Sequence, residues 1–238
     1  MSQQSRIASP VAHLLLVALS LAAIALAPLP AARAWIIVLA VQIALIWNMW
    51  RFAQDAAITR KLVSCVPIMA GAAIAMQFWP YQLSVPVELS ALPVAMALAA
   101  AMVGFFGLNL YRSRAFFAEP ELVEFVQPHM NKPLARAEIV HMLVAPAAEE
   151  LMFRAFPATF FTDLPSYAVF SISTFILVHY INPWSARKIN PLGLLEQVAM
   201  AALLTLIFLG FGLGWAILAH TLYNLTARSF YAAYLIRT

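Results

Sequence analysis

The sequence predicts an all-α membrane protein, a polytopic bundle of about eight transmembrane helices, and three observations favour this fold class. First, 64% of the 238 residues are hydrophobic and only 10% are charged, whereas soluble domains carry about 25% charged residues. Second, eight apolar stretches reach roughly 17–25 residues, the length that crosses the hydrocarbon core of a bilayer. Third, basic residues are concentrated in alternate connections between these stretches, which is typical of polytopic membrane proteins.

The eight predicted spans form a single transmembrane domain, residues 1–238, without internal repeats. Prolines and glycines mark several boundaries: Pro28 and Pro30 precede the second span, Pro165 ends the turn before the sixth, and Gly210, Gly212 and Gly214 break the chain before the eighth. A charged connection with three prolines, residues 112–137, separates the fourth span from the fifth. The predicted spans are residues 11–29, 34–53, 62–79, 87–111, 138–161, 166–181, 194–209 and 215–231.

The first span also has an alternative interpretation. Arg6, the apolar stretch after it and the segment Ala32-Arg33-Ala34 together resemble a secretory signal peptide with its cleavage site. The apolar stretch is long for a signal core, and its retention gives an even number of spans. We therefore interpret it as a transmembrane helix, with cleavage before Trp35 as the alternative.

The distribution of lysine and arginine predicts the orientation. With eight spans, twelve basic residues fall on one side of the membrane, Arg33 falls on the other, and Arg154 lies inside the bilayer. The positive-inside bias then places both termini in the cytoplasm, in a plasma (inner) membrane protein. No basic run is longer than two residues, so no nucleic-acid partner is predicted. The twelve residues are Arg6, Arg51, Arg60, Lys61, Arg112, Arg114, Lys132, Arg136, Arg187, Lys188, Arg228 and Arg237.

The fifth predicted span contains the most costly residues to bury. Glu149, Glu150 and Arg154 lie within the otherwise apolar segment 144–156, and each charge at the centre of a membrane helix costs about 2.5–3.5 kcal/mol. Glu150 and Arg154 are four residues apart, so they share a helical face and can pair. Glu149 points about 100° away, towards another helix. One acid is thus predicted to be structural and the other available for chemistry.

Two later spans carry further polar pairs at helical spacing. Phe175 and His179 share a face of the sixth span, and His220 and Asn224 share a face of the eighth. Either pair alone is more often a packing or hydrogen-bonding contact than a catalytic site. His141, eight residues before Glu149, is a weaker candidate that could modulate the site.

The combination of these groups supplies what a hydrolase needs. A glutamate in an apolar pocket can act as a general base on water, and a histidine facing it can orient that water or share its proton. A second histidine and an amide can donate hydrogen bonds to the oxyanion that forms on a carbonyl after attack. Water activation without a covalent nucleophile is therefore chemically complete.

In its last four spans the sequence resembles the CPBP superfamily of type II CAAX prenyl endopeptidases and Abi proteins, which are eight-helix intramembrane glutamic proteases. The family pattern is EExxxR, then FxxxH, then HxxxN, and these motifs stand in order here at Glu149–Arg154, Phe175–His179 and His220–Asn224. Ala155 replaces a glycine that is frequent in the family. The resemblance covers about residues 138–226, and only hydropathy agrees before that.

The resemblance implies an intramembrane endopeptidase that hydrolyses a membrane-associated, hydrophobic or lipidated protein or peptide without a cofactor. Glu149 would be the water-activating base assisted by His179, and His220 would stabilise the oxyanion together with Asn224. Glu150 and Arg154 would shape the site. The six implied site residues are Glu149, Glu150, Arg154, His179, His220 and Asn224.

Two other function classes remain open. One is a zinc peptidase with Glu149, His179 and His220 as ligands, although the sequence contains no HExxH motif and no metal site is predicted. The other is a non-catalytic membrane scaffold or transporter-like protein, in which the buried charges fix a conformation or carry protons.

Overall fold

The computed structural model describes residues 29–52, 57–83, 92–119, 121–126, 131–181 and 191–237. These residues form an all-α structure, as predicted. The first predicted span, apart from Leu29, lies outside the described residues. The α-helices are α2 (Pro30–Phe52), α3 (Ala57–Phe78), α4 (Leu92–Ala118), α5 (Glu121–Val126), α6 (Lys132–Glu150), α7 (Leu164–Ile181), α8 (Pro191–Phe211), α9 (Leu213–Ala227) and α10 (Ser229–Arg237).

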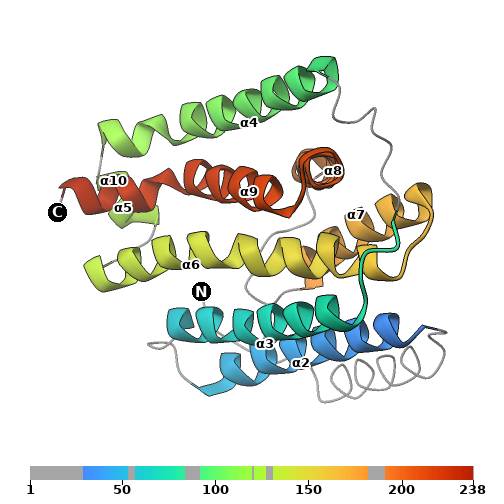
Figure 1. The fold of residues 1–238 in the computed structure, drawn as a ribbon. Coiled ribbons are helices and arrows are strands. Elements are labelled where there is room, and N and C mark those ends of the chain that lie inside the picture. Colours follow the sequence, from blue (N-terminus) through green and yellow to red (C-terminus); the bar gives the residue numbers. More distant parts are fainter. Residues whose placement is uncertain are drawn as a thin grey trace.

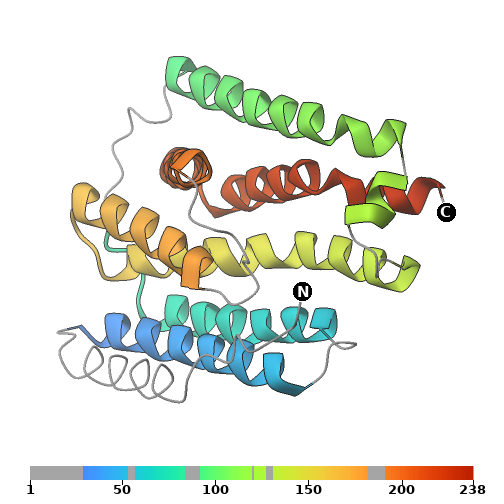
Figure 2. The ribbon, with the colours of Figure 1, turned by 180° about the vertical axis from the view of Figure 1, so that it is seen from behind.

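The helices are stacked with α6 in the middle. Figure 1 shows α4 on one outer side, α9 and α10 between α4 and α6, and α3 and α2 on the opposite side of α6. Helix α8 is seen almost end-on beside α9, and α7 lies near the C-terminal end of α6. The view from behind in Figure 2 shows the same order. Helix α6 can therefore address partners from both halves of the chain.

Local signals in the sequence set several helix ends. The Asn131 side chain accepts a hydrogen bond from the Leu134 amide (2.8 Å) and caps α6. The Asp163 carboxylate accepts one from the Ser166 amide (2.8 Å) and caps α7, as expected for short oxygen-bearing side chains at a helix start. Gly212 has φ of 88°, a conformation that favours glycine, and it separates α8 from α9. The predicted break before the eighth span is confirmed at this residue.

Two predicted boundaries differ from the structure. The connection predicted at residues 112–137 is shorter, because α4 continues to Ala118, α5 occupies Glu121–Val126, and α6 already begins at Lys132. The predicted eighth span at 215–231 is two helices, since the backbone turns at Arg228 between α9 and α10. Charged residues can extend a helix beyond an apolar core, so hydropathy alone placed these ends incorrectly.

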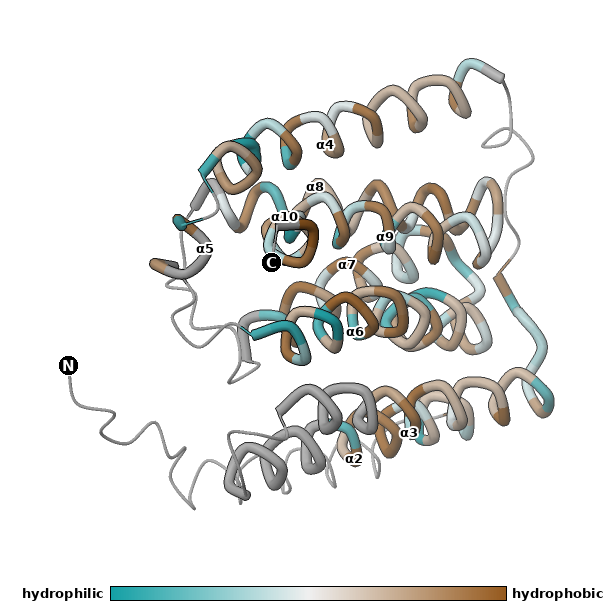
Figure 3. Tube along the Cα trace, turned by 90° about the vertical axis from the view of Figure 1, so that its left-hand side faces the viewer, coloured by the Kyte–Doolittle hydropathy of each residue, from teal (hydrophilic) through white to brown (hydrophobic). Residues whose placement is uncertain are grey.

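Two described helical segments are long and apolar enough to cross a membrane, Pro93–Ala118 and Gly193–Phe211. Shorter apolar helical segments occur at Pro30–Gln42, Cys65–Phe78 and Leu164–His179. Figure 3 shows hydrophobic residues along the helices, with hydrophilic residues gathered near the junction of α4 with α5 and at the start of α6. By length and composition the two long segments are compatible with membrane-spanning helices.

A π-helical turn, η2 (Leu151–Ala155), directly follows α6 and is continued by the 3₁₀ turn η3 (Pro157–Thr159). Its widened hydrogen bond runs from the Phe156 amide to the Leu151 carbonyl (2.9 Å), five residues back. Every residue from 152 to 159 is buried, and Met152, Phe153 and Phe156 belong to the core between α3, α6 and α7. Single π turns of this kind occur frequently at functional sites.

Candidate functional site

The centre of the site is a fully enclosed ion pair. Arg154 Nη1 donates to Glu150 Oε1 at 3.1 Å, and both side chains have 0% exposure. This confirms the pairing predicted from their four-residue spacing. Arg154 Nη2 also donates to the Ala201 carbonyl of α8 (3.4 Å). The charge of Glu150 is therefore balanced inside the protein by a fixed guanidinium.

His220 of α9 contacts both glutamates. Its Nδ1 lies 2.7 Å from Glu150 Oε1, and its Nε2 lies 3.6 Å from Glu149 Oε2. The His220 side chain is 4% exposed, so this contact is enclosed. A chain of polar groups thus runs from Arg154 through Glu150 and His220 to Glu149.

Glu149 lies at the open side of the group. Its side chain is 24% exposed, and its Oε2 lies 3.7 Å from His179 Nε2 of α7 as well as 3.6 Å from His220. These separations exceed hydrogen-bond length, and Glu149 Oε2 makes no hydrogen bond within the described part of the chain. His179 is 33% exposed. The structure therefore gives the two neighbouring glutamates different surroundings: Glu150 is fully enclosed, whereas the Glu149 side chain is partly exposed although its Oε2 is buried.

Both histidines are oriented through Nδ1. His179 Nδ1 lies 2.8 Å from the Phe175 carbonyl. Because a carbonyl can only accept, this nitrogen carries the proton. An ionised carboxylate can also only accept, so His220 Nδ1 carries a proton when it is hydrogen-bonded to ionised Glu150. In each ring the other nitrogen, Nε2, then faces Glu149.

Phe175 packs against three polar groups of the site. The Arg154 guanidinium lies 4.3 Å from the centre of its ring, and the ring centres of His179 and His220 lie 4.3 and 5.8 Å away. Phe153 meets the same ring edge-on at 5.7 Å. A cation over an aromatic face is attracted to it, so Phe175 supports Arg154 while excluding water.

The remaining sequence-predicted residues lie at different distances from this group. Asn224 follows His220 by one turn of α9 and is half-buried, and its side chain has no hydrogen bond to another described residue. His141, the weaker candidate, lies 4.0 Å from Glu138. The structure thus brings together Glu149, Glu150, Arg154, His179 and His220. Among the residues that the structure describes, no group of three histidine, cysteine, aspartate or glutamate side chains is arranged to hold a metal ion.

Comparison with known proteins gives a match over this part of the chain. Residues 134–226 match the family model described as Type II CAAX prenyl endopeptidase Rce1-like. These residues are a CPBP-family domain. Membership in this type II CAAX endopeptidase family implies a membrane protease that acts on protein or peptide substrates. The predicted resemblance is confirmed, and the matched segment begins four residues earlier than predicted.

The other comparisons add no relatives of this CPBP domain. No curated protein matches the chain, and no solved structure matches it.

Sequence reasoning missed two side chains that touch the π turn of the CPBP domain. Trp35 of α2 donates to the Met152 carbonyl (2.7 Å), and Tyr167 of α7 donates to the Arg154 carbonyl (3.2 Å). Hydropathy treats both as ordinary membrane aromatics. Pro157 was the sequence signal that could have indicated these contacts. Proline lacks an N–H, so a carbonyl of the preceding turn loses its helical donor and needs one from another part of the protein.

Proposed function

We propose that the chain is an intramembrane glutamic endopeptidase in which Glu149 activates the hydrolytic water. The observation that carries this proposal is the position of Glu149. Its side chain is 24% exposed, and its buried Oε2, which makes no hydrogen bond within the described part of the chain, lies 3.6 and 3.7 Å from the Nε2 atoms of two histidines. A general base must be within reach of the proton that it removes, either directly or through one water.

The neighbouring residues support this role by holding the group in one arrangement. Glu150 Oε1 is engaged by both Arg154 (3.1 Å) and His220 (2.7 Å), and the Glu150 side chain is 0% exposed, so a substrate does not reach it in this arrangement. The bond from His220 Nδ1 to Glu150 fixes the imidazole ring, and an imidazole fixed in this way presents its other nitrogen in a defined direction. His179 is held in the same manner by the Phe175 carbonyl.

The proposed reaction balances its protons on these residues. Glu149 removes a proton from water while the water oxygen attacks the peptide carbonyl carbon. The oxyanion that forms accepts hydrogen bonds from the Asn224 amide and from His220 Nε2; because His220 Nδ1 already donates to Glu150, this step requires the ring to carry a proton on both nitrogens before attack and to keep both throughout. The tetrahedral intermediate then collapses, the C–N bond breaks, and Glu149 returns the proton to the leaving amine. His179 orients the water through Nε2.

The substrate would approach from the side where Glu149 and His179 are exposed, since Glu150, Arg154 and His220 are enclosed. We propose a membrane-anchored or hydrophobic protein tail as the substrate, because the domain belongs to a membrane protease family and the exposed sides of the helices are apolar. The family description makes a tail with a prenylated C-terminal cysteine the first substrate to test.

We further propose eight spans with both termini in the cytoplasm and cleavage in the cytoplasmic half of the membrane. His179 lies two residues before the end of α7, which this orientation places at the cytoplasmic face. Cysteine labelling checks the orientation: with Lys132→Cys in a Cys65→Ala background, a membrane-impermeant maleimide should react only after permeabilisation. Labelling in intact cells, or a mature chain that begins near Trp35, would contradict the orientation and favour a cleaved signal peptide.

The catalytic test compares the two adjacent glutamates. The purified protein in liposomes is given fluorogenic peptides with a C-terminal farnesyl-cysteine motif, together with the same peptides lacking the farnesyl group. Glu149→Gln should lose turnover by about 10²–10⁴-fold, which is the usual contribution of a general base, while the protein remains folded. Glu150→Gln should lose less, because an amide oxygen can still accept from Arg154 and His220.

Glu138→Gln is the matched control, since Glu138 is a buried glutamate of the same helix outside the site. It should retain turnover. Equal and mild losses at Glu149 and Glu150 would contradict the division of roles. Loss of activity with a chelator and recovery with zinc would favour a metal peptidase. A Glu149→Gln protein that keeps its cellular phenotype would favour a scaffold or transporter.

A further inference from the structure

The π turn after α6 leaves the carbonyl of Met152 without a helical donor. The Phe156 amide, four residues later, donates to Leu151 instead. The next donor in the π pattern would be residue 157, a proline without an N–H. Met152 has 0% exposure, so water cannot replace the donor. A buried carbonyl in this position requires a partner from elsewhere in the protein.

Trp35 provides that partner. Its indole Nε1 donates to the Met152 carbonyl at 2.7 Å across 117 residues of sequence. Trp35 is 5% exposed, and its ring is held edge-on against Phe170 of α7 with ring centres 4.9 Å apart. The hydrogen bond therefore joins α2 to the turn between the catalytic glutamates and the end of the fifth predicted span.

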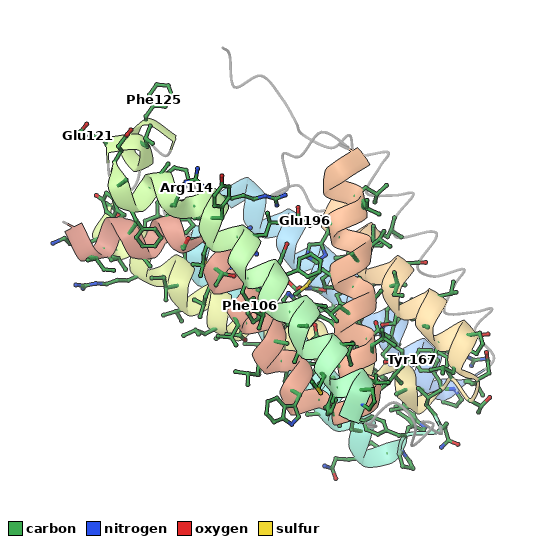
Figure 4. The ribbon with its side chains drawn as sticks, turned by 90° about the horizontal axis from the view of Figure 1, so that it is seen from above. Phe106, Arg114, Glu121, Phe125, Tyr167 and Glu196 are labelled. Carbon is green, nitrogen blue, oxygen red and sulfur yellow. The ribbon has the colours of Figure 1, made fainter. Side chains whose placement is uncertain are left out.

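A second carbonyl of the same turn, that of Arg154, is bound in the same way. The Tyr167 hydroxyl donates to the Arg154 carbonyl at 3.2 Å. Tyr167 has 0% exposure and packs against Phe208 of α8. Figure 4 labels it towards the end of the bundle opposite α5.

These two hydrogen bonds hold the backbone on which the Arg154 side chain is mounted. Arg154 binds Glu150, Glu150 binds His220, and His220 faces Glu149. A rotation of the π turn would move the guanidinium and loosen each of these contacts in sequence. We propose that Trp35 and Tyr167 are positioning residues for the site, an inference that rests on the proposed endopeptidase activity.

The inference extends the site beyond the matched domain. Trp35 lies on α2, whereas the family match covers residues 134–226. Because the Trp35 indole is within hydrogen-bond distance of the π turn, the first half of the chain contributes to the geometry of the catalytic half. Truncation to the matched domain would remove this contribution.

The experiment removes each donor while preserving shape. Tyr167→Phe deletes only the hydroxyl, and 3-benzothienylalanine at position 35 replaces the indole N–H by sulfur. Each change should lower kcat about 10- to 100-fold with KM little altered, because a displacement of about 1 Å at a catalytic group can cost 10²-fold. Trp79→Phe and Tyr231→Phe, which alter other partly or fully buried aromatics, are the controls and should keep kcat.

A second readout does not depend on activity. Full-length protein labelled with ¹⁵N-histidine is examined by NMR for the proton on His220 Nδ1, assigned with His220→Asn. Both donor-deletion variants should shift or broaden this signal, whereas the two controls should not. If the wild type hydrolyses no peptide, the proposed function fails and the NMR result alone decides the inference. Folded variants with unchanged kcat and an unchanged His220 signal would overturn it.

Discussion

Helix α6 carries two buried glutamates with similar partners and different surroundings. Near its start, Glu138 lies 3.8 Å from Arg228 and 4.0 Å from His141. At its end, Glu150 lies 3.1 Å from Arg154 and 2.7 Å from His220. Each group thus joins one carboxylate, one arginine and one histidine. The two contacts of Glu150 are short enough to be hydrogen bonds, whereas the 3.8 and 4.0 Å contacts of Glu138 are too long.

The difference lies mainly in the arginines. Arg228 is 48% exposed at the turn between α9 and α10, so water screens its charge. Arg154 is 0% exposed, held by the Ala201 carbonyl and the Phe175 ring. A charge pair in water contributes little, whereas a dry pair fixes its geometry and makes the loss of either partner costly. The comparison shows how similar residue types can form a long, screened contact at one end of a helix and a short, enclosed one at the other.

Helix α9 links the two groups. Glu150 meets His220 and Glu138 meets Arg228, so α6 and α9 run antiparallel. Asn224 lies midway between His220 and Arg228, four residues from each. Its position on α9 is compatible with either group, and a functional measurement decides whether it belongs to the proposed catalytic group.

The largest effect is expected for Arg154→Ala. Removing this guanidinium strands the Glu150 charge in an enclosed site, which typically costs about 3–5 kcal/mol of unfolding free energy. Denaturant or thermal unfolding in a fixed detergent would measure the loss, and activity should fall with it. A variant as stable as the wild type would show that Glu150 does not need its buried partner.

A smaller effect is expected for Asn224→Ala. Loss of one oxyanion donor typically lowers turnover by about 10²–10³-fold, so the variant should retain a trace of activity that Glu149→Gln lacks. The measurement is kcat on the same fluorogenic peptides, with substrate binding little changed. Unaltered turnover would assign Asn224 to helix packing and leave His220 as the donor from α9.

The smallest effect is expected for Arg228→Ala, the control for Arg154→Ala. Arg228 is half-exposed and lies 3.8 Å from the buried Glu138, and a pair with a solvent-screened partner contributes about 0–1 kcal/mol, so its loss should leave kcat unchanged. Unfolding and turnover are measured under the same conditions as for Arg154→Ala. A destabilisation equal to that of Arg154→Ala would remove the distinction between the two ends of α6.

The sequence by itself determined the features that depend on local spacing and composition. The four-residue separation of Glu150 and Arg154 predicts their pairing because side chains one helical turn apart are neighbours. The apolar stretches predict an all-α membrane protein, and the three glycines at 210, 212 and 214 predict the break before α9, which the structure places at Gly212. Three ordered motifs are sufficient to indicate the CPBP family. These inferences succeed because each needs only residues that are close in the chain or a pattern that the family shares.

The tertiary structure decided which distant residues meet. His220 reaches Glu150 across 70 residues, and Trp35 reaches Met152 across 117. Hydropathy shows that a helix is apolar but not which other helix it packs against, so it cannot predict such pairs. The donors of the π turn were equally hidden: Pro157 signals that a carbonyl of this turn lacks a donor, but it does not identify Trp35 of α2 or Tyr167 of α7 as the side chains that donate. Buried backbone carbonyls need a hydrogen-bond donor, and which side chain donates depends on how the helices pack in three dimensions. The spacing of residues in the sequence does not specify that packing.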